Sequence, residues 1–63
     1  MTRFEKDYRD TLEGYGTEVL KRRKEELDKL RDEYRKSHGF RRECLAGEIA
    51  RCKSEYDQID SLI

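Results

Sequence analysis

The last third of the chain carries the pattern that most constrains its fold. From residue 45 onward, apolar side chains recur in alternating steps of four and three positions: Leu45, Ile49, Cys52, Tyr56, Ile59 and Ile63. This spacing places them along one stripe of an α-helix, as in the seam of a coiled coil, whereas a strand would alternate every second residue. We therefore predict a helix over residues 40–62 that packs one face against another helix.

A second long helix is predicted over residues 17–38, which contain neither Gly nor Pro. Its apolar side chains also gather on one face: Val19, Leu20, Leu27, Leu30 and Tyr34. Gly39 can adopt the left-handed conformation that ends a helix, with Phe40 covering Tyr34. Because two helices of similar length joined by so short a turn must run antiparallel, the pattern predicts a helical hairpin.

A shorter helix is predicted over residues 3–13. Thr2 and Glu5 fit a capping box, in which the threonine hydroxyl accepts a hydrogen bond from the Glu5 amide and the Glu5 carboxylate accepts one from the Thr2 amide. Phe4, Tyr8 and Leu12 then follow at intervals of four and form one apolar stripe. Two glycines within residues 14–16 disfavour helix, so we expect a kink or break there, with Thr17 as the N-cap of the next helix.

Composition limits how such a chain can bury a core. Of 63 residues, 33% are hydrophobic and 48% charged, and the 15 basic and 15 acidic side chains cancel to a net charge of zero. A chain this short forms a single domain, here residues 1–63, and its core is thin. We therefore expect an all-α hairpin with a short N-terminal helix, paired into a homodimeric bundle. The predicted core and dimer seam contains Leu20, Leu27, Leu30, Tyr34, Leu45, Ile49, Cys52, Tyr56 and Ile59.

The two cysteines lie on one predicted helix and cannot bond to each other. Cys44 and Cys52 are eight positions apart, roughly 12 Å along a helix axis, whereas a disulfide needs Cα atoms within about 7 Å. Reduced thiols are expected, and an interchain bridge through Cys52 is the alternative. Because the N-terminal residues contain no secretory signal and no membrane span, we expect a cytoplasmic protein without membrane contact.

The residue types that carry catalysis or bind metals are sparse or badly placed. His38 is the only histidine, and with Cys44 it supplies two ligands at most, which is too few for a structural zinc site. The many carboxylates lie on exposed helix faces, where nothing shifts their pKa values toward those of a general acid or base. We expect no enzyme activity, no catalytic residues, no bound metal and no cofactor.

The charges are unevenly distributed along the hairpin. Around its turn lie four cations that would make a basic tip: Arg35, Lys36, Arg41 and Arg42. This tip, or the basic run at residues 21–24, could grip phosphates, so a DNA-binding regulator is one alternative function. The zero net charge and the lack of any DNA-binding motif argue against nucleic acid. The run at residues 21–24 is then simply a solvated helix face.

What remains is recognition of another protein by a helix face. The candidate partner surface is aromatic and aliphatic and contains Phe4, Tyr8, Leu12 and Tyr15. Because tyrosine is enriched at binding hot spots, Tyr15 between its two glycines is a plausible anchor, or else a lid on the end of the bundle. We therefore expect a small, non-enzymatic protein–protein interaction module that binds an unidentified protein partner.

Three resemblances bear on the biological role. Residues 26–30, Glu-Leu-Asp-Lys-Leu, resemble part of a family of small phosphatases from sporulating bacteria, but Lys24 and Glu25 replace that family's Ser-Gln, so the activity is not carried over. The layout of a short segment followed by a charged hairpin is similar to the co-chaperones of type III secretion needle subunits, which implies a chaperone as an alternative function.

The size and the charged hairpin also resemble the small accessory proteins encoded between the exonuclease and excisionase genes of lambdoid bacteriophages. Of the three resemblances, this one is preferred for the biological role. It implies a regulatory protein in the host cytoplasm that acts on host physiology or on the choice between lysis and lysogeny.

Overall fold

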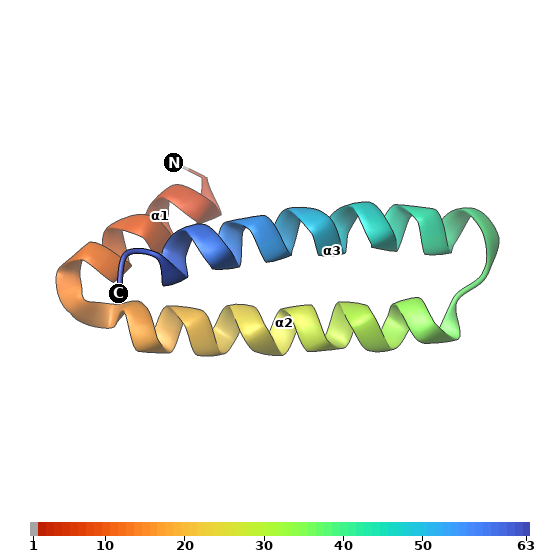
Figure 1. Cartoon of the computed structure of the whole chain (residues 1–63), viewed down its shortest axis with the longest axis horizontal. Helices are drawn as coiled ribbons and strands as arrows, with labels where there is room; N and C mark the ends of the chain where they lie inside the picture. The colour runs from red at the N-terminus through yellow and green to blue at the C-terminus, as the bar shows by residue number, and fades with distance from the viewer. Residues whose placement is uncertain (1) are drawn as a thin grey trace.

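The computed structural model describes residues 2–63, and these residues form helices and no strand. Two long antiparallel helices make a hairpin, and a short N-terminal helix folds back beside its open end (Figure 1). The molecule is elongated, measuring 41 × 20 × 17 Å. The expected all-α class is confirmed. In chain order the elements are α1 (Arg3–Asp10), the turn η1 (Thr11–Tyr15), α2 (Gly16–Lys36) and α3 (Gly39–Asp60).

Helix α1 begins with one of the two hydrogen bonds of the predicted capping box. The Glu5 amide donates to the Thr2 hydroxyl at 3.2 Å, which satisfies one of the free amides at the helix start. The regular helix ends at Asp10, three residues before the predicted end, because the chain widens into η1. Gly14 in this turn has a φ of 102°, a left-handed value that only glycine adopts without strain. The break thus falls inside residues 14–16, where two glycines had been expected to disfavour helix.

Helix α2 starts one residue earlier than expected and without the expected cap. Gly16 is its first residue, and no side-chain hydrogen bond caps it. Thr17 is therefore inside the helix and does not serve as its N-cap. A side chain on Gly16 would meet Ile63 and Thr11 at 2.8 and 3.1 Å, so a glycine here lets the C-terminus pack against the start of α2.

The turn between the long helices differs from the predicted stop. Helix α2 ends at Lys36, where the Ser37 hydroxyl donates to the Glu33 carbonyl at 2.7 Å, and the next two residues are extended. Gly39 is left-handed, with a φ of 63°, but it begins α3 instead of closing α2. Phe40 is 80% exposed and does not cover Tyr34. The prediction was wrong because the serine had already capped the helix.

The core lies between α2 and α3 within one chain. Val19 and Ile59 are fully buried, and Leu27 and Leu45 are nearly so. The rest of the predicted seam is half-buried along the same hairpin: Leu20, Leu30, Tyr34, Ile49, Cys52 and Tyr56. Pairing between chains stays a prediction. None of the helices in residues 2–63 has the length and apolar character needed to cross a membrane.

Candidate functional site

A buried ion-pair network holds the three helices together at the open end of the hairpin. The Arg23 guanidinium on α2 donates to Asp7 on α1 at 2.8 Å and to Glu55 on α3 at 3.0 Å. Arg23 is 6% exposed and Asp7 5%. Because buried charges are tolerated only when paired and hydrogen-bonded, this network fixes where α1 sits.

Arg23 fills a gap in the apolar stripe of α2. The stripe runs Leu20, then Leu27, Leu30 and Tyr34, and position 23 completes the alternating steps of three and four. A guanidinium therefore occupies a core position, stacked 5.8 Å above the Phe4 ring. The interpretation of residues 21–24 as a solvated basic face is wrong for this residue. The missing member of the stripe is the signal in the sequence that points to it.

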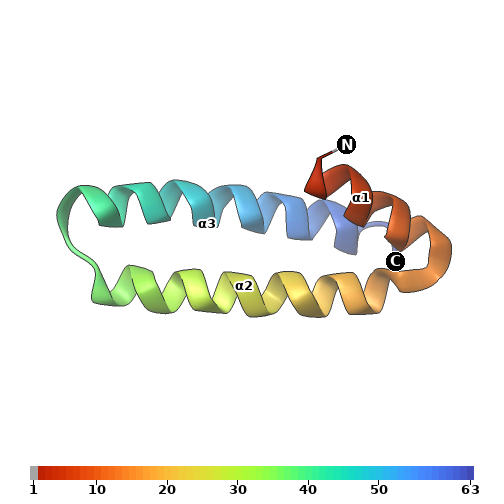
Figure 2. The ribbon, with the colours of Figure 1, turned by 180° about the vertical axis from the view of Figure 1, so that it is seen from behind.

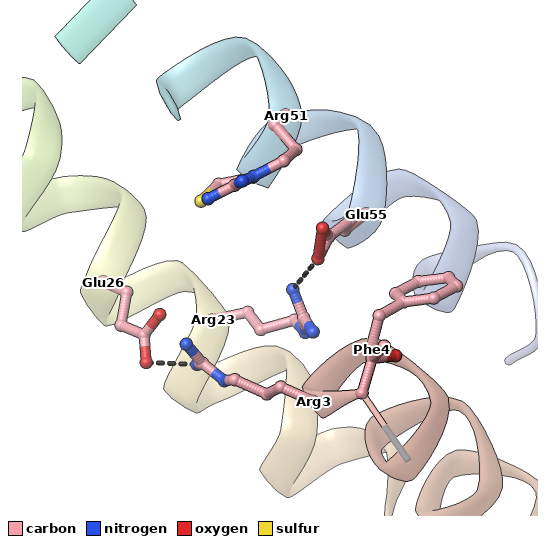
Figure 3. Close-up of a pocket in the computed structure, with 8 residues that line it drawn as sticks. Arg3, Phe4, Arg23, Glu26, Arg51 and Glu55 are labelled. Atoms are coloured by element: carbon pink, nitrogen blue, oxygen red, sulfur yellow. Dashed lines mark hydrogen bonds and ion pairs between the residues drawn. The ribbon is translucent and has the colours of Figure 1, made fainter. Parts of the chain in front are cut away.

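A cleft of about 350 Å³ opens beside this network (Figure 3). Arg3 of α1 bonds to Glu26 of α2 across it, which raises the pKa of the Arg3 guanidinium above its ordinary value. Arg51 reaches the cleft from α3. Because the arginines and carboxylates here largely neutralise one another, the cleft is an anchoring site for α1 and offers little net charge to a ligand. It is lined by Thr2, Arg3, Phe4, Arg23, Glu26, Arg51, Cys52 and Glu55.

Helix α1 is inverted relative to an ordinary surface helix. Its buried residue is Asp7, whose carbonyl accepts a hydrogen bond at 2.8 Å from the hydroxyl of Thr11, a buried residue of η1. Its apolar Phe4 is half-buried beside Arg23, whereas Tyr8 is 40% exposed and Leu12, in η1, is 65% exposed. A surface helix normally buries its apolar stripe and exposes its polar face. The sequence folds the opposite way because Asp7 has a buried arginine to pair with.

The outward stripe forms one continuous apolar patch. The Phe4 and Tyr8 rings lie 6.1 Å apart, and Leu12 extends the stripe by one more turn. We name Phe4, Tyr8 and Leu12 the α1 outer surface. A shallow groove of about 370 Å³ follows it, bordered by Glu5 and Arg9. Tyr15, the fourth member of the predicted partner surface, is 57% exposed on the far side of the break.

The predicted basic tip is occupied by contacts within the chain. Asp32 pairs with Lys36 at 3.0 Å and with Arg35 at 3.4 Å, and the hydrogen bond from Lys36 lowers the pKa of the Asp32 carboxyl. Arg41 lies 3.9 Å from a carboxylate oxygen of Glu33. The fourth cation, Arg42, stacks 4.5 Å above the ring of Tyr34. The tip is therefore a mixed-charge surface.

The cysteines and histidine do not converge. Cys44 is exposed and Cys52 is half-buried in the hairpin, both as free thiols. Within residues 2–63, no group of three or more histidine, cysteine or carboxylate side chains is arranged to hold a metal ion. Whether Cys52 bridges two chains stays a prediction.

No protein-family model matches the chain, and neither a curated protein nor a solved structure does. Its function is therefore inferred from its own geometry.

Proposed function

We propose that this protein is a protein–protein interaction module that binds its partner through the α1 outer surface. The observation that carries the proposal is the inversion at the N-terminus: Asp7 of α1 is buried, whereas Tyr8 of α1 is 40% exposed and Leu12 of η1 is 65% exposed. Leaving apolar side chains in water while burying a carboxylate costs free energy that a merely structural helix would not spend. Such a helix is explained when its apolar face has a partner to cover it.

The way α1 is attached suits it for binding. Phe4 and Tyr8 are aromatic, and aromatic side chains are enriched in interface cores and at hot spots. The ion pairs of Asp7 and Arg3 hold the helix on the hairpin before any partner arrives. Because the binding face is already ordered, association loses less conformational entropy than folding a free segment would.

The proposal is tested by capture from a host cell extract with matched variants. We expect the wild-type protein to enrich a specific protein and Leu12→Glu to lose it. Phe40→Glu serves as the control, because Phe40 is 80% exposed on the tip, well away from α1. Circular dichroism should show that both variants remain helical.

Retention of the same protein by Leu12→Glu, or its loss in Phe40→Glu, would contradict binding through α1. The accessory role in a bacteriophage implied by the resemblance stays a prediction, and the identity of the captured protein would test it.

A further inference from the structure

We infer that the α1 outer surface also binds a second copy of this chain, as a two-fold symmetric pair of antiparallel α1 helices. This inference rests on the proposed function, because it concerns the same surface. The sequence predicted a homodimer through the seam of the two long helices, whereas this inference places the dimer contact on the α1 outer surface. The predicted seam packs within one hairpin, where Ile59 is fully buried, Leu27 and Leu45 are nearly so, and its other members are half-buried.

The charges that border the surface favour this arrangement. Glu5 and Arg9 stand one turn apart on the exposed edge of the stripe, and both border the groove. The opposite edge of α1, with Asp7 and Thr11, is buried against the hairpin. Only the Glu5 and Arg9 edge can therefore meet a neighbour.

A two-fold axis across the stripe brings this edge against the same edge of the neighbour, running in the reverse direction. Glu5 then faces the partner's Arg9, and Arg9 faces the partner's Glu5. No like charges meet. A second copy running parallel to the first would lose this match.

The apolar side chains fit the same symmetry. Tyr8 is the middle residue of the stripe, with Phe4 and Leu12 four positions to either side. In the register that pairs Glu5 with the partner's Arg9, the two-fold axis crosses α1 at position 7. The two Tyr8 side chains then lie one residue to either side of the axis, and Phe4 lies within one turn of the partner's Leu12. Each aromatic ring at one end thus meets an aliphatic side chain. In both views of the ribbon, the other helices of residues 2–63 lie on the hairpin side of α1 (Figures 1 and 2).

The small size of the α1 outer surface indicates that the pair is weak. Its three side chains lie within little more than two helical turns, and they cannot bury the ~800 Å² that each partner of a standard interface buries. We therefore expect a weak, exchanging dimer with a dissociation constant on the order of tens of micromolar.

Sedimentation equilibrium of the purified chain, from micromolar to millimolar concentration, tests the inference. The wild-type protein and the tip variant Phe40→Glu should dimerise alike, and Leu12→Glu should remain monomeric. Glu5→Arg alone, or Arg9→Glu alone, should weaken the dimer about tenfold, because two symmetry-related pairs become repulsive. The double variant Glu5→Arg/Arg9→Glu should restore the wild-type dissociation constant.

A wild-type monomer at millimolar concentration would overturn the inference, as would a double variant as weak as the single ones. These outcomes are separable from those of the capture experiment. A monomeric wild type whose captured protein still depends on Leu12 would sustain the proposed function and remove the dimer. If the wild type forms a dimer that needs Leu12 but captures no protein that depends on Leu12, the dimer would be sustained and the proposed function would be removed.

Discussion

The two ends of the hairpin are built from the same pair of helices and differ in what covers them. At the open end α1 adds a third helix, and Val19 and Ile59 are fully buried there. At the tip only α2 and α3 are present, Leu45 is the one nearly buried apolar side chain, and Phe40 is 80% exposed. Three helices therefore bury apolar side chains fully, whereas two helices alone leave most of their apolar side chains partly exposed.

The same comparison shows how the third helix is attached. The long helices join through leucine, isoleucine and valine, whereas α1 is anchored at its centre by the Asp7–Arg23 pair. Apolar contacts are not directional, but a buried ion pair accepts only one geometry, so it can fix the rotation of a helix about its axis. This is how α1 keeps its apolar face outward.

The largest expected effect comes from removing the arginine at the open end. Arg23→Met leaves Asp7 and Glu55 without their common partner. Because Asp7 is only 5% exposed, the free energy of unfolding should fall by about 3 kcal/mol. Urea denaturation followed by circular dichroism measures this loss.

Arg22→Met is the matched control. The Arg22 side chain is 60% exposed, and it approaches Asp7 only at 3.9 Å. Its removal should change the stability by less than about 0.5 kcal/mol. Equal losses from the two variants would show that the network does not anchor α1.

The next effect contrasts a core isoleucine at the open end with one nearer the tip. Ile59→Ala empties a fully buried site and should lower the free energy of unfolding by about 3 kcal/mol. Ile49→Ala removes a half-buried side chain, so roughly half that loss is expected. Chemical denaturation of both variants compares the two ends directly. A larger loss at Ile49 would mean that the tip carries the core.

Two glycines with opposite roles give a smaller contrast. Gly14→Ala places a side chain on a backbone with a φ of 102°, which should destabilise the fold by about 1 kcal/mol. Gly47 is inside α3 with nothing within 4 Å of an added Cβ, so Gly47→Ala should stabilise by about 0.5 to 1 kcal/mol. Thermal unfolding curves should therefore shift in opposite directions. Shifts of the same sign would argue against the break at Gly14.

The smallest effect is the acid response of the tip. The hydrogen bond from Lys36 lowers the pKa of Asp32 below its ordinary value of 3.8. The ion pair therefore adds stability in full above that value, and loses it as the pH falls through the lower pKa of the folded state. Carboxyl NMR titration should show the pKa of Asp32 rising in Lys36→Met and unchanged in Lys24→Met. A pKa that does not move in Lys36→Met would contradict the pairing.

The sequence was enough to predict the hairpin because its causes are local or periodic. The apolar steps from Leu45 to Ile59 identify α3, and Gly14 lies where the chain breaks, although Gly16 is helical. The Thr2 cap could likewise be predicted from four residues. These features depend on neighbours within one or two turns.

The anchoring network depends on residues far apart in the chain and could not be predicted in this way. Arg23 lies 16 positions from Asp7 and 32 from Glu55. The gap in the α2 stripe points to Arg23, but the polarity pattern treats Asp7 and Glu55 as surface residues, because it has no means of recognising that they meet this arginine. The side to which the apolar face of α1 points follows from the contact between Asp7 and Arg23 and from the turn at Gly14. The stripe of Phe4, Tyr8 and Leu12 could therefore be found from the sequence, but not the side to which it points.

Amide hydrogen exchange measured by NMR tests the central claim most directly, namely that α1 is held on the hairpin with its apolar face outward. We predict that the amides of residues 7–10 in α1 are protected at a level comparable to the first turns of α2, and that Arg23→Met abolishes this protection while the middle of α3 keeps its own. Exchange of the α1 amides at the rate of an unstructured peptide in the wild-type protein would contradict the account, because a helix that is not docked presents no fixed surface.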